Sequence, residues 1–205
     1  GNKGHVRIYQ WNGSSWDQMG SDIDGEAAND YSGAKVSLSS DGTMVAIQAQ
    51  TNDGNGADSG HVRVYQWNGS SWNQLGTDID GEAAGDRSGT ASLSSDGTIV
   101  AIGSSNNDGN GNDSGHVRVY QWNGTSWDQV GADIDGEATG DWGGWSLSLS
   151  SDGTIVAIGG PNNDGNGNNS GHVRVYQWNG SSWVQLGLDI DGEAADDWSG
   201  HTVSL

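Results

Sequence analysis

The chain contains no cysteine and no phenylalanine, a single proline, and only 7 basic residues against 27 acidic ones among its 205 residues. Without cysteine no disulfide can form, so cysteine usage does not indicate a redox compartment. No run of about 20 apolar residues occurs, which excludes an ordinary membrane-spanning helix. Apolar residues also never recur at helical spacing over a useful length, and we therefore expect no helix.

The shortage of basic residues leaves a formal net charge of −20. Such a surface repels the phosphate backbone of nucleic acids and the face of an anionic membrane, so neither is expected as a partner. The acidic residues have two interpretations. They can keep a tryptophan-rich protein soluble, or they can bind divalent cations.

What the chain does contain is a repeat. The segment His-Val-Arg-Ile/Val-Tyr-Gln-Trp starts at His5 and returns at His61, His116 and His172, at intervals of 56, 55 and 56 residues. A fixed period of this size is typical of repeat architectures. Together with 36 glycines and short runs of Val, Ile, Thr, Trp and Tyr, it indicates an array of β units.

One repeat predicts four strands joined by turns. Alternating or continuous apolar residues mark the strands, and Asp152-Gly153 and Asn179-Gly180 mark hairpin turns between them. The expected strands cover residues 145–149, 154–159, 172–178 and 183–187. A polar loop over residues 162–171 separates the second from the third.

A lone sheet of this size buries too little apolar area to be stable, so its copies must stack face to face. We therefore predict an all-β protein, a β-propeller of four-stranded antiparallel blades with a 55–56-residue repeat. The alternative is an open linear β array. The expected units are a partial blade (1–29, strands three and four), three blades (30–84, 85–139 and 140–195) and the first strand of a further blade (196–205). Both ends are expected to be interior points of a longer array, which predicts a larger ring or an open array rather than four sealed blades.

The repeats resemble the FG-GAP repeats of integrin α subunits, in a bacterial or algal-type tandem form. Trp142-Gly143 matches the Phe-Gly step before the innermost strand, and Gly159-Gly160-Pro161 matches the Gly-Ala-Pro step after the second. The segment from Gly171 to Tyr176 is similar to the family's third strand. The resemblance implies an extracellular or cell-surface propeller that acts in adhesion or ligand binding.

Members of that family often bind calcium in the turn between the first two strands. Here that turn offers one carboxylate in each repeat (Asp41, Asp96 or Asp152), whereas Ca²⁺ needs six to eight oxygens, so this property does not transfer. The loop after the second strand is a better candidate, because oxygen side chains stand at alternate positions before a glycine. Its candidate Ca²⁺ ligands are Asp53, Asn55, Asp108, Asn110, Asp164 and Asn166. The alternative is a turn that only needs left-handed backbone.

Aromatic and asparagine side chains at fixed positions suggest two kinds of carbohydrate chemistry. Eight of the 11 tryptophans stand in pairs around the Asn-Gly hairpin, where they can stack on sugar rings or pack between blades. The hairpin asparagines are also acceptors for N-glycosylation if the protein is eukaryotic and secreted. They are Asn12, Asn68, Asn123 and Asn179.

Histidine and arginine recur in every repeat, as in His61 and Arg63, and identical copies do not make one catalytic centre. The sequence therefore predicts a protein that is not an enzyme and has no certain cofactor. Three functions stay open. They are adhesion or ligand binding, a purely structural module of an extracellular assembly, and a glycan-binding lectin. The expected partners are other protein chains or surface glycans.

Overall fold

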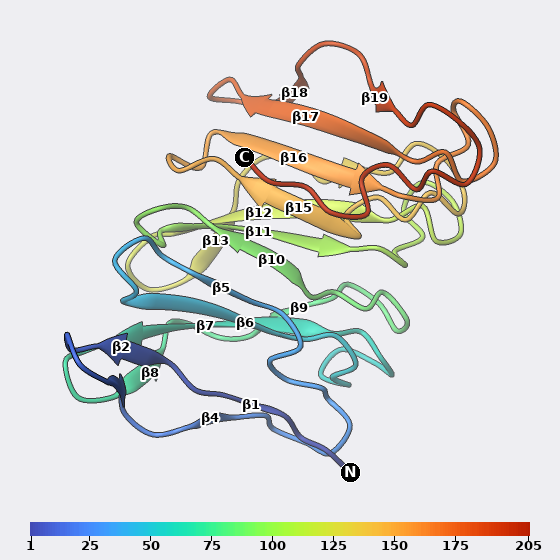
Figure 1. The fold of residues 1–205 in the computed structure, drawn as a ribbon. Coiled ribbons are helices and arrows are strands. Elements are labelled where there is room, and N and C mark those ends of the chain that lie inside the picture. The colour runs from blue at the N-terminus through green and yellow to red at the C-terminus, as the bar shows by residue number, and fades with distance from the viewer.

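The computed structural model describes residues 1–205 and consists entirely of β-strands and turns (Figure 1). Three complete antiparallel sheets follow one another along the chain. The first contains β5 (Val36–Leu38), β6 (Met44–Ala49), β7 (His61–Trp67), β8 (Trp72–Gln74) and β9 (Ile79–Asp80). The second contains β10 (Thr90–Leu93), β11 (Ile99–Ser104), β12 (His116–Trp122), β13 (Trp127–Gln129) and β14 (Ile134–Asp135). The third contains β15 (Ser146–Leu149), β16 (Ile155–Gly160), β17 (His172–Trp178), β18 (Trp183–Gln185) and β19 (Ile190–Asp191).

Each sheet is four strands wide, because its fifth element shares a position with the fourth. In the first sheet β8 pairs with one end of β7, where Trp67 lies opposite Trp72. The short β9 pairs with the other end, where His61 lies opposite Asp80. The outermost strand of every blade is therefore interrupted, and the repeats form the four-position antiparallel blades of a β-propeller.

A smaller unit precedes these blades and contains only outer strands. β1 (His5–Val6) pairs with β4 (Ile23–Asp24), and β2 (Tyr9–Trp11) pairs with β3 (Trp16–Gln18). At the other end of the chain, residues 196–205 run beside β15, where the Leu205 N–H donates to Ser148 Oγ. Figure 1 shows the units fanned in chain order, with the β1–β4 unit and the β18–β19 edge at opposite sides of the molecule.

The core lies between neighbouring blades. One cluster joins Met44, Val62 and Ile79 of the first blade to Val100 and Ile102 of the second. Strands β7 and β12 are buried on both faces up to their tyrosine, whereas β17 alternates between buried and half-buried residues. Face-to-face stacking explains this difference, because the last blade is covered on one face only.

Polar contacts recur at every seam, by which we mean the interface between two neighbouring blades, and they hold the two blades together. Arg63 Nη2 donates to the carbonyl oxygen of Asp24 at 2.9 Å, and Trp72 Nε1 donates to that of Met19 at 2.8 Å. Equivalent bonds join the later blades. The first indole of the pair packs on the preceding blade as well, since a Cβ at Gly20 would lie 2.8 Å from the Trp67 ring. The paired tryptophans of the complete blades therefore pack at the seams.

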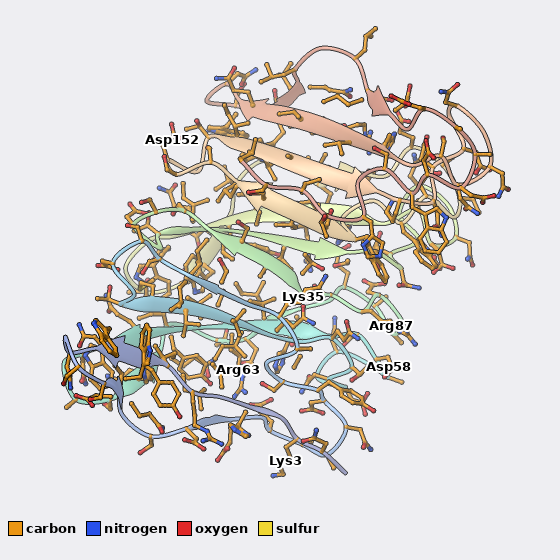
Figure 2. All side chains as sticks on the ribbon, in the orientation of Figure 1. Lys3, Lys35, Asp58, Arg63, Arg87 and Asp152 are labelled. Atoms are coloured by element: carbon orange, nitrogen blue, oxygen red, sulfur yellow. The ribbon has the colours of Figure 1, made fainter.

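The innermost strand β10 contacts both β5 and β15, and serine hydroxyls link these neighbours. Ser37 Oγ accepts a hydrogen bond from Leu93 N, and Ser92 Oγ accepts one from Leu149 N. In Figure 2, Asp152 and Arg87 lie at opposite ends of the sheets, and Lys35 lies on the side of Arg87. None of the structure's elements is a helix that could cross a membrane.

Candidate functional site

The repeats differ where the innermost strand begins. Gly33, Gly89 and Gly144 are equivalent, because each donates its N–H to the same carbonyl position of the neighbouring second strand. After this glycine come Ala34-Lys35 in the first blade, Trp145-Ser146 in the third and His201-Thr202 after it. The second blade has Thr90 alone, which makes its repeat one residue shorter.

These differing residues meet in space. Lys35 Nζ donates to Thr90 Oγ1 at 3.1 Å and to the carbonyl oxygen of Trp145 at 3.2 Å, so that one side chain crosses the second blade to reach the third. The ammonium also lies 5.7 Å from the centre of the Trp145 ring. His201 also lies beside this ring, with 5.7 Å between the ring centres. We call Lys35, Thr90, Trp145 and His201 the axial mouth, because they stand where the innermost strands begin.

Two further tryptophans stack on the aromatic side chains of the axial mouth. Trp142 stacks on Trp145 with ring centres 5.2 Å apart, and Trp198 stacks on His201 at 6.3 Å. Both adopt a left-handed backbone, with φ of 58° for Trp142 and 54° for Trp198, which is uncommon for a bulky residue. The aromatic rings are thus oriented by a strained turn that places them at the start of the innermost strand.

A cavity of about 350 Å³ adjoins the axial mouth and runs along the three innermost strands. Hydroxyl groups of Thr90, Ser146 and Thr202 line it together with Lys35 and His201. Desolvation by the surrounding strands lowers the pKa of Lys35. The cavity thus combines an amine, hydroxyls and an imidazole beside aromatic faces.

A second kind of polar group lies at the seams, away from the innermost strands. Each seam brings together a glutamate of one blade with a histidine and an aspartate of the next, and these side chains could hold a metal ion. The three groups, which we call the seam clusters, are Glu26–His61–Asp78, Glu82–His116–Asp133 and Glu137–His172–Asp189. The histidine Nδ1 atom is 3.4 Å from Asp78 Oδ2 in the first cluster and 3.6 Å from Asp133 Oδ2 in the second.

Burial decides the protonation of these histidines. All three are almost completely buried, and the loss of hydration lowers the pKa of His61 and His172, and that of His116 to about 4. Burial also raises the pKa of Asp80 and of Asp135, which pair with the histidines across the sheet. The imidazoles are therefore neutral near pH 7, as a metal ligand must be.

The loop residues proposed from sequence as Ca²⁺ ligands lie outside the seam clusters. The aspartates close their own loops, since Oδ1 of Asp53 accepts a hydrogen bond from Asp58 N and the later repeats do the same. The asparagines tie the loop to the next crossover: Asn110 Nδ2 donates to the carbonyl oxygens of Gly136 and Glu137. Asn55 and Asn166 make equivalent bonds. Calcium binding in these loops stays a prediction.

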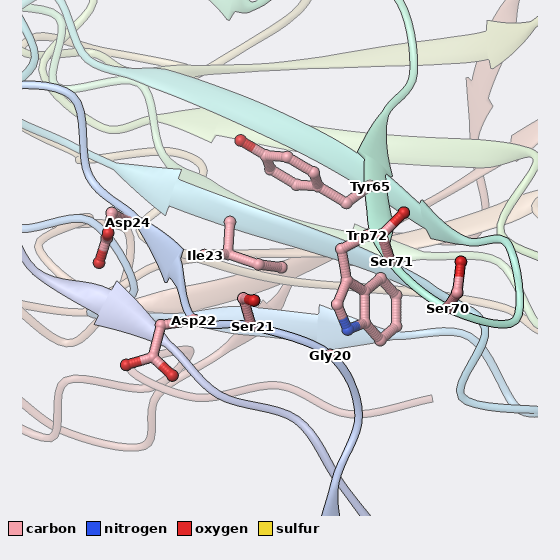
Figure 3. A pocket seen from close by; sticks show the side chains of 9 residues that line it. All are labelled: Gly20, Ser21, Asp22, Ile23, Asp24, Tyr65, Ser70, Ser71 and Trp72. Carbon is pink, nitrogen blue, oxygen red and sulfur yellow. The ribbon is translucent and has the colours of Figure 1, made fainter.

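The glycosylation candidates Asn12, Asn68, Asn123 and Asn179 all lie exposed at hairpin tips, where they remain candidates. Beside one of these hairpins is a cavity of about 350 Å³ lined by Asp22, Asp24, Tyr65 and Trp72, among others (Figure 3). Its residues Asp22, Asp24, Tyr65 and Trp72 have identical counterparts in every repeat. Unlike the axial mouth, this cavity is therefore built around residues that are the same in every repeat.

No protein-family model matches the sequence, and no curated protein matches it. Solved structures do match the fold. They include putative 6-phosphogluconolactonases from Bacteroides uniformis (12% identity, TM-score 0.62) and Bacteroides fragilis (9% identity, TM-score 0.59). The matches cover 91% and 88% of this chain but 48% and 43% of those proteins. The chain thus spans about half the length of the structures it matches, and the likeness shows the fold alone.

These matches correct the prediction that the protein is not an enzyme, since the matched proteins of this fold bear an enzyme's name. The prediction rested on identical histidines and arginines in every repeat. That argument overlooked the residues that do not repeat. Lys35, Trp145 and His201 come from different repeats, and the fold brings them to a single place. The signal that could have found them is the position-by-position difference between aligned repeats.

Proposed function

We propose that the protein is a ligand-binding β-propeller whose site is the axial mouth, and that its ligand is a sugar with an acidic group. One observation carries this proposal. The non-repeated side chains Lys35, Trp145 and His201 converge, whereas the side chains that hold the blades together are repeated almost unchanged.

Each part of the axial mouth suits one feature of such a ligand. An aromatic face stacks on the apolar face of a sugar ring, and the hydroxyl of Thr202 can exchange hydrogen bonds with the hydroxyls of the sugar. In a chain with only 7 basic residues, an ammonium at the site favours a carboxylate or phosphate substituent. Adhesion to acidic surface glycans is the form of this function that fits the expected extracellular location.

The structural alternative and the lectin alternative have less support. A purely structural array gives no reason for differing side chains from several repeats to converge at one place. A lectin that uses the hairpin tryptophans needs free indole faces, and in the complete blades these rings pack against the preceding blade.

The test is calorimetric titration of the 205-residue chain with neutral sugars, uronic acids, sugar phosphates and a sugar-acid lactone. We expect an acidic sugar to bind and its neutral parent to bind more weakly. Lys35→Ala should weaken binding by about tenfold, the effect of losing one charge-assisted hydrogen bond. Trp145→Ala should weaken it as well.

Trp16→Ala is the matched control, because Trp16 is 66% exposed and lies outside the axial mouth. It should leave the affinity unchanged. Equal affinity for neutral and acidic sugars, or equal losses in Trp16→Ala and Trp145→Ala, would contradict the proposal. The lactone sample is also followed for acid release, because the matched Bacteroides proteins bear a lactonase's name.

A further inference from the structure

The seam clusters provide a donor set that favours one class of metal ion. Each offers one imidazole nitrogen and two carboxylate oxygens, and these ligand atoms lie within 4.8 Å of one another. Calcium and magnesium prefer oxygen ligands alone, whereas imidazole with carboxylate suits Zn²⁺ and its neighbours among the transition metals.

The spacing of the donors also fits such an ion. His172 Nδ1 lies 3.7 Å from Glu137 Oε2 and 3.8 Å from Asp189 Oδ2. Ligands bound to tetrahedral zinc at its usual bond lengths stand about 3.4 Å apart. Small side-chain movements would therefore bring the three atoms to coordination distance, without a change in the backbone.

An independent observation shows that two of the three histidines lack a hydrogen-bond partner at the nitrogen that faces the carboxylates. The Nδ1 atoms of His61 and His172 make no hydrogen bond, and the two side chains are only 1% and 2% exposed. A buried polar atom without a partner is costly, and in native proteins it calls for a reason. Here the unpartnered nitrogen faces two carboxylates across a gap.

The charged side chains at a seam carry more negative than positive charge, which favours the binding of a cation. Two of the glutamates divide their oxygens between an arginine and a histidine: Glu82 Oε1 lies 3.6 Å from Arg118 Nη1, and Glu82 Oε2 lies 3.8 Å from His116 Nδ1. Glu137 does the same with Arg174 and His172. One arginine thus stands against two carboxylates of the cluster, with Asp135 paired to the histidine across the sheet as well. A divalent ion beside the neutral imidazole would offset this excess of negative charge.

We infer that each seam cluster binds one divalent transition-metal ion of the zinc class, and that the ion links two neighbouring blades. The glutamate comes from the crossover of one blade, and the histidine and the aspartate come from the next. The ion would therefore link the two blades, in addition to the arginine and tryptophan hydrogen bonds that are repeated at each seam. This site is separate from the axial mouth and does not depend on the function proposed for it.

Metal content tests the inference directly. The untagged 205-residue chain is stripped with chelator, dialysed against ZnCl₂ and then against metal-free buffer, and its bound zinc is measured by atomic emission. We expect three Zn²⁺ per chain, one for each cluster, and a higher Tm than for the stripped protein. Cobalt(II) should give the visible absorption of a four-coordinate site, and excess CaCl₂ should not displace the zinc.

Glu82→Gln removes one ligand on a side chain that is 46% exposed, so the variant is expected to fold, and it should bind two ions. The matched control is Glu193→Gln, at the equivalent position of the last crossover, where the 205 residues contain no counterpart of His61, His116 or His172 to complete a cluster. It should still bind three. Fewer than one bound zinc, displacement by calcium, or the same metal content in both variants would overturn the inference.

Discussion

At the scale of single residues, glycine is required where neighbouring chains touch. Gly115 has φ of 73°, and a Cβ there would collide with the carbonyl oxygen of Gly143 in the next crossover. The two residues form an isolated parallel bridge that joins a blade to the turn preceding the following blade. Because the obstacle is backbone, it cannot rotate away.

Gly115→Ala should therefore lower the free energy of unfolding by about 3 kcal/mol, from strain and collision together. Gly124→Ala is the control, since Gly124 has φ of 101° but nothing lies within 4 Å of a Cβ there. It should cost only about 1 kcal/mol, the backbone term alone. Denaturant titration measures both. Equal costs would mean that the close approach at Gly115 is unimportant.

The aspartates of the first hairpin turn give a second prediction at this scale. Hydrogen bonds from Ser150 and Thr154 lower the pKa of Asp152 to about 2, and similar bonds lower the pKa of Asp41 and Asp96. A lowered pKa means that the carboxylate stabilises the fold above its unfolded value of about 4 and that this contribution is lost as the pH falls toward 2.

The Tm of the wild-type chain should consequently fall between about pH 4 and pH 2. The triple variant Asp41→Asn, Asp96→Asn, Asp152→Asn should have a lower Tm at pH 7 and a shallower decline over that window. Calorimetry at stepped pH distinguishes the two slopes. Parallel curves for the two proteins would show that these turns do not contribute to the acid dependence.

At the scale of strands and hairpins, a hairpin tryptophan should contribute more to the free energy of unfolding where it packs against the preceding blade than where it is exposed. Trp127 Nε1 donates to the carbonyl oxygen of Leu75 in the preceding blade at 3.0 Å. Trp16 occupies the same repeat position but is 66% exposed. Trp127→Ala should lower the free energy of unfolding by about 3 kcal/mol and Trp16→Ala by less than about 1 kcal/mol.

Chemical unfolding of the two variants checks this difference. If both substitutions cost the same, the hairpin itself and not the seam would account for the contribution of the tryptophan.

The long strands were predictable because their residue patterns are strong. The third strand expected over residues 172–178 is β17, and the second, expected over 154–159, is displaced from β16 by one residue. The two-residue strand β19 was not predicted, because two residues carry no periodicity and Asp-Ile-Asp-Gly reads as a turn. Sequence also did not reveal the axial mouth, since the innermost strands must first be placed side by side.

The seam clusters escaped prediction for a related reason. Glu82 and His116 are 34 positions apart in the sequence and belong to different blades, so no local spacing connects them. The loop proposed as a calcium site satisfied a local spacing rule, and its side chains instead hold the loop closed. Sites made by stacking repeats therefore need the repeat geometry before they can be recognised.

At the scale of the whole molecule, the protection of backbone amides against hydrogen exchange should be uneven along the chain. Strands β11 and β12 are covered by neighbouring blades on both faces, whereas the β1–β4 unit consists of two separate two-stranded sheets. In a repeat protein each unit is stabilised by its nearest neighbours. The middle blade should therefore be the most stable part of this chain.

Native-state hydrogen exchange followed by mass spectrometry tests this gradient. Amides of β11 and β12 should exchange slowest, and those of β1–β4 should exchange fastest among the strands. Uniform protection from the first strand to the last would show that the 205 residues unfold as one cooperative unit.

The near identity of the seams has a consequence for how such a protein can change over generations. Arg63, Arg118 and Arg174 make the same contact to the blade before, so any blade can follow any other. An in-frame duplication or loss of one repeat would preserve the arginine contact at every seam while the number of units changes. Selection can then change the few residues of the axial mouth without altering the repeated contacts that join one blade to the next.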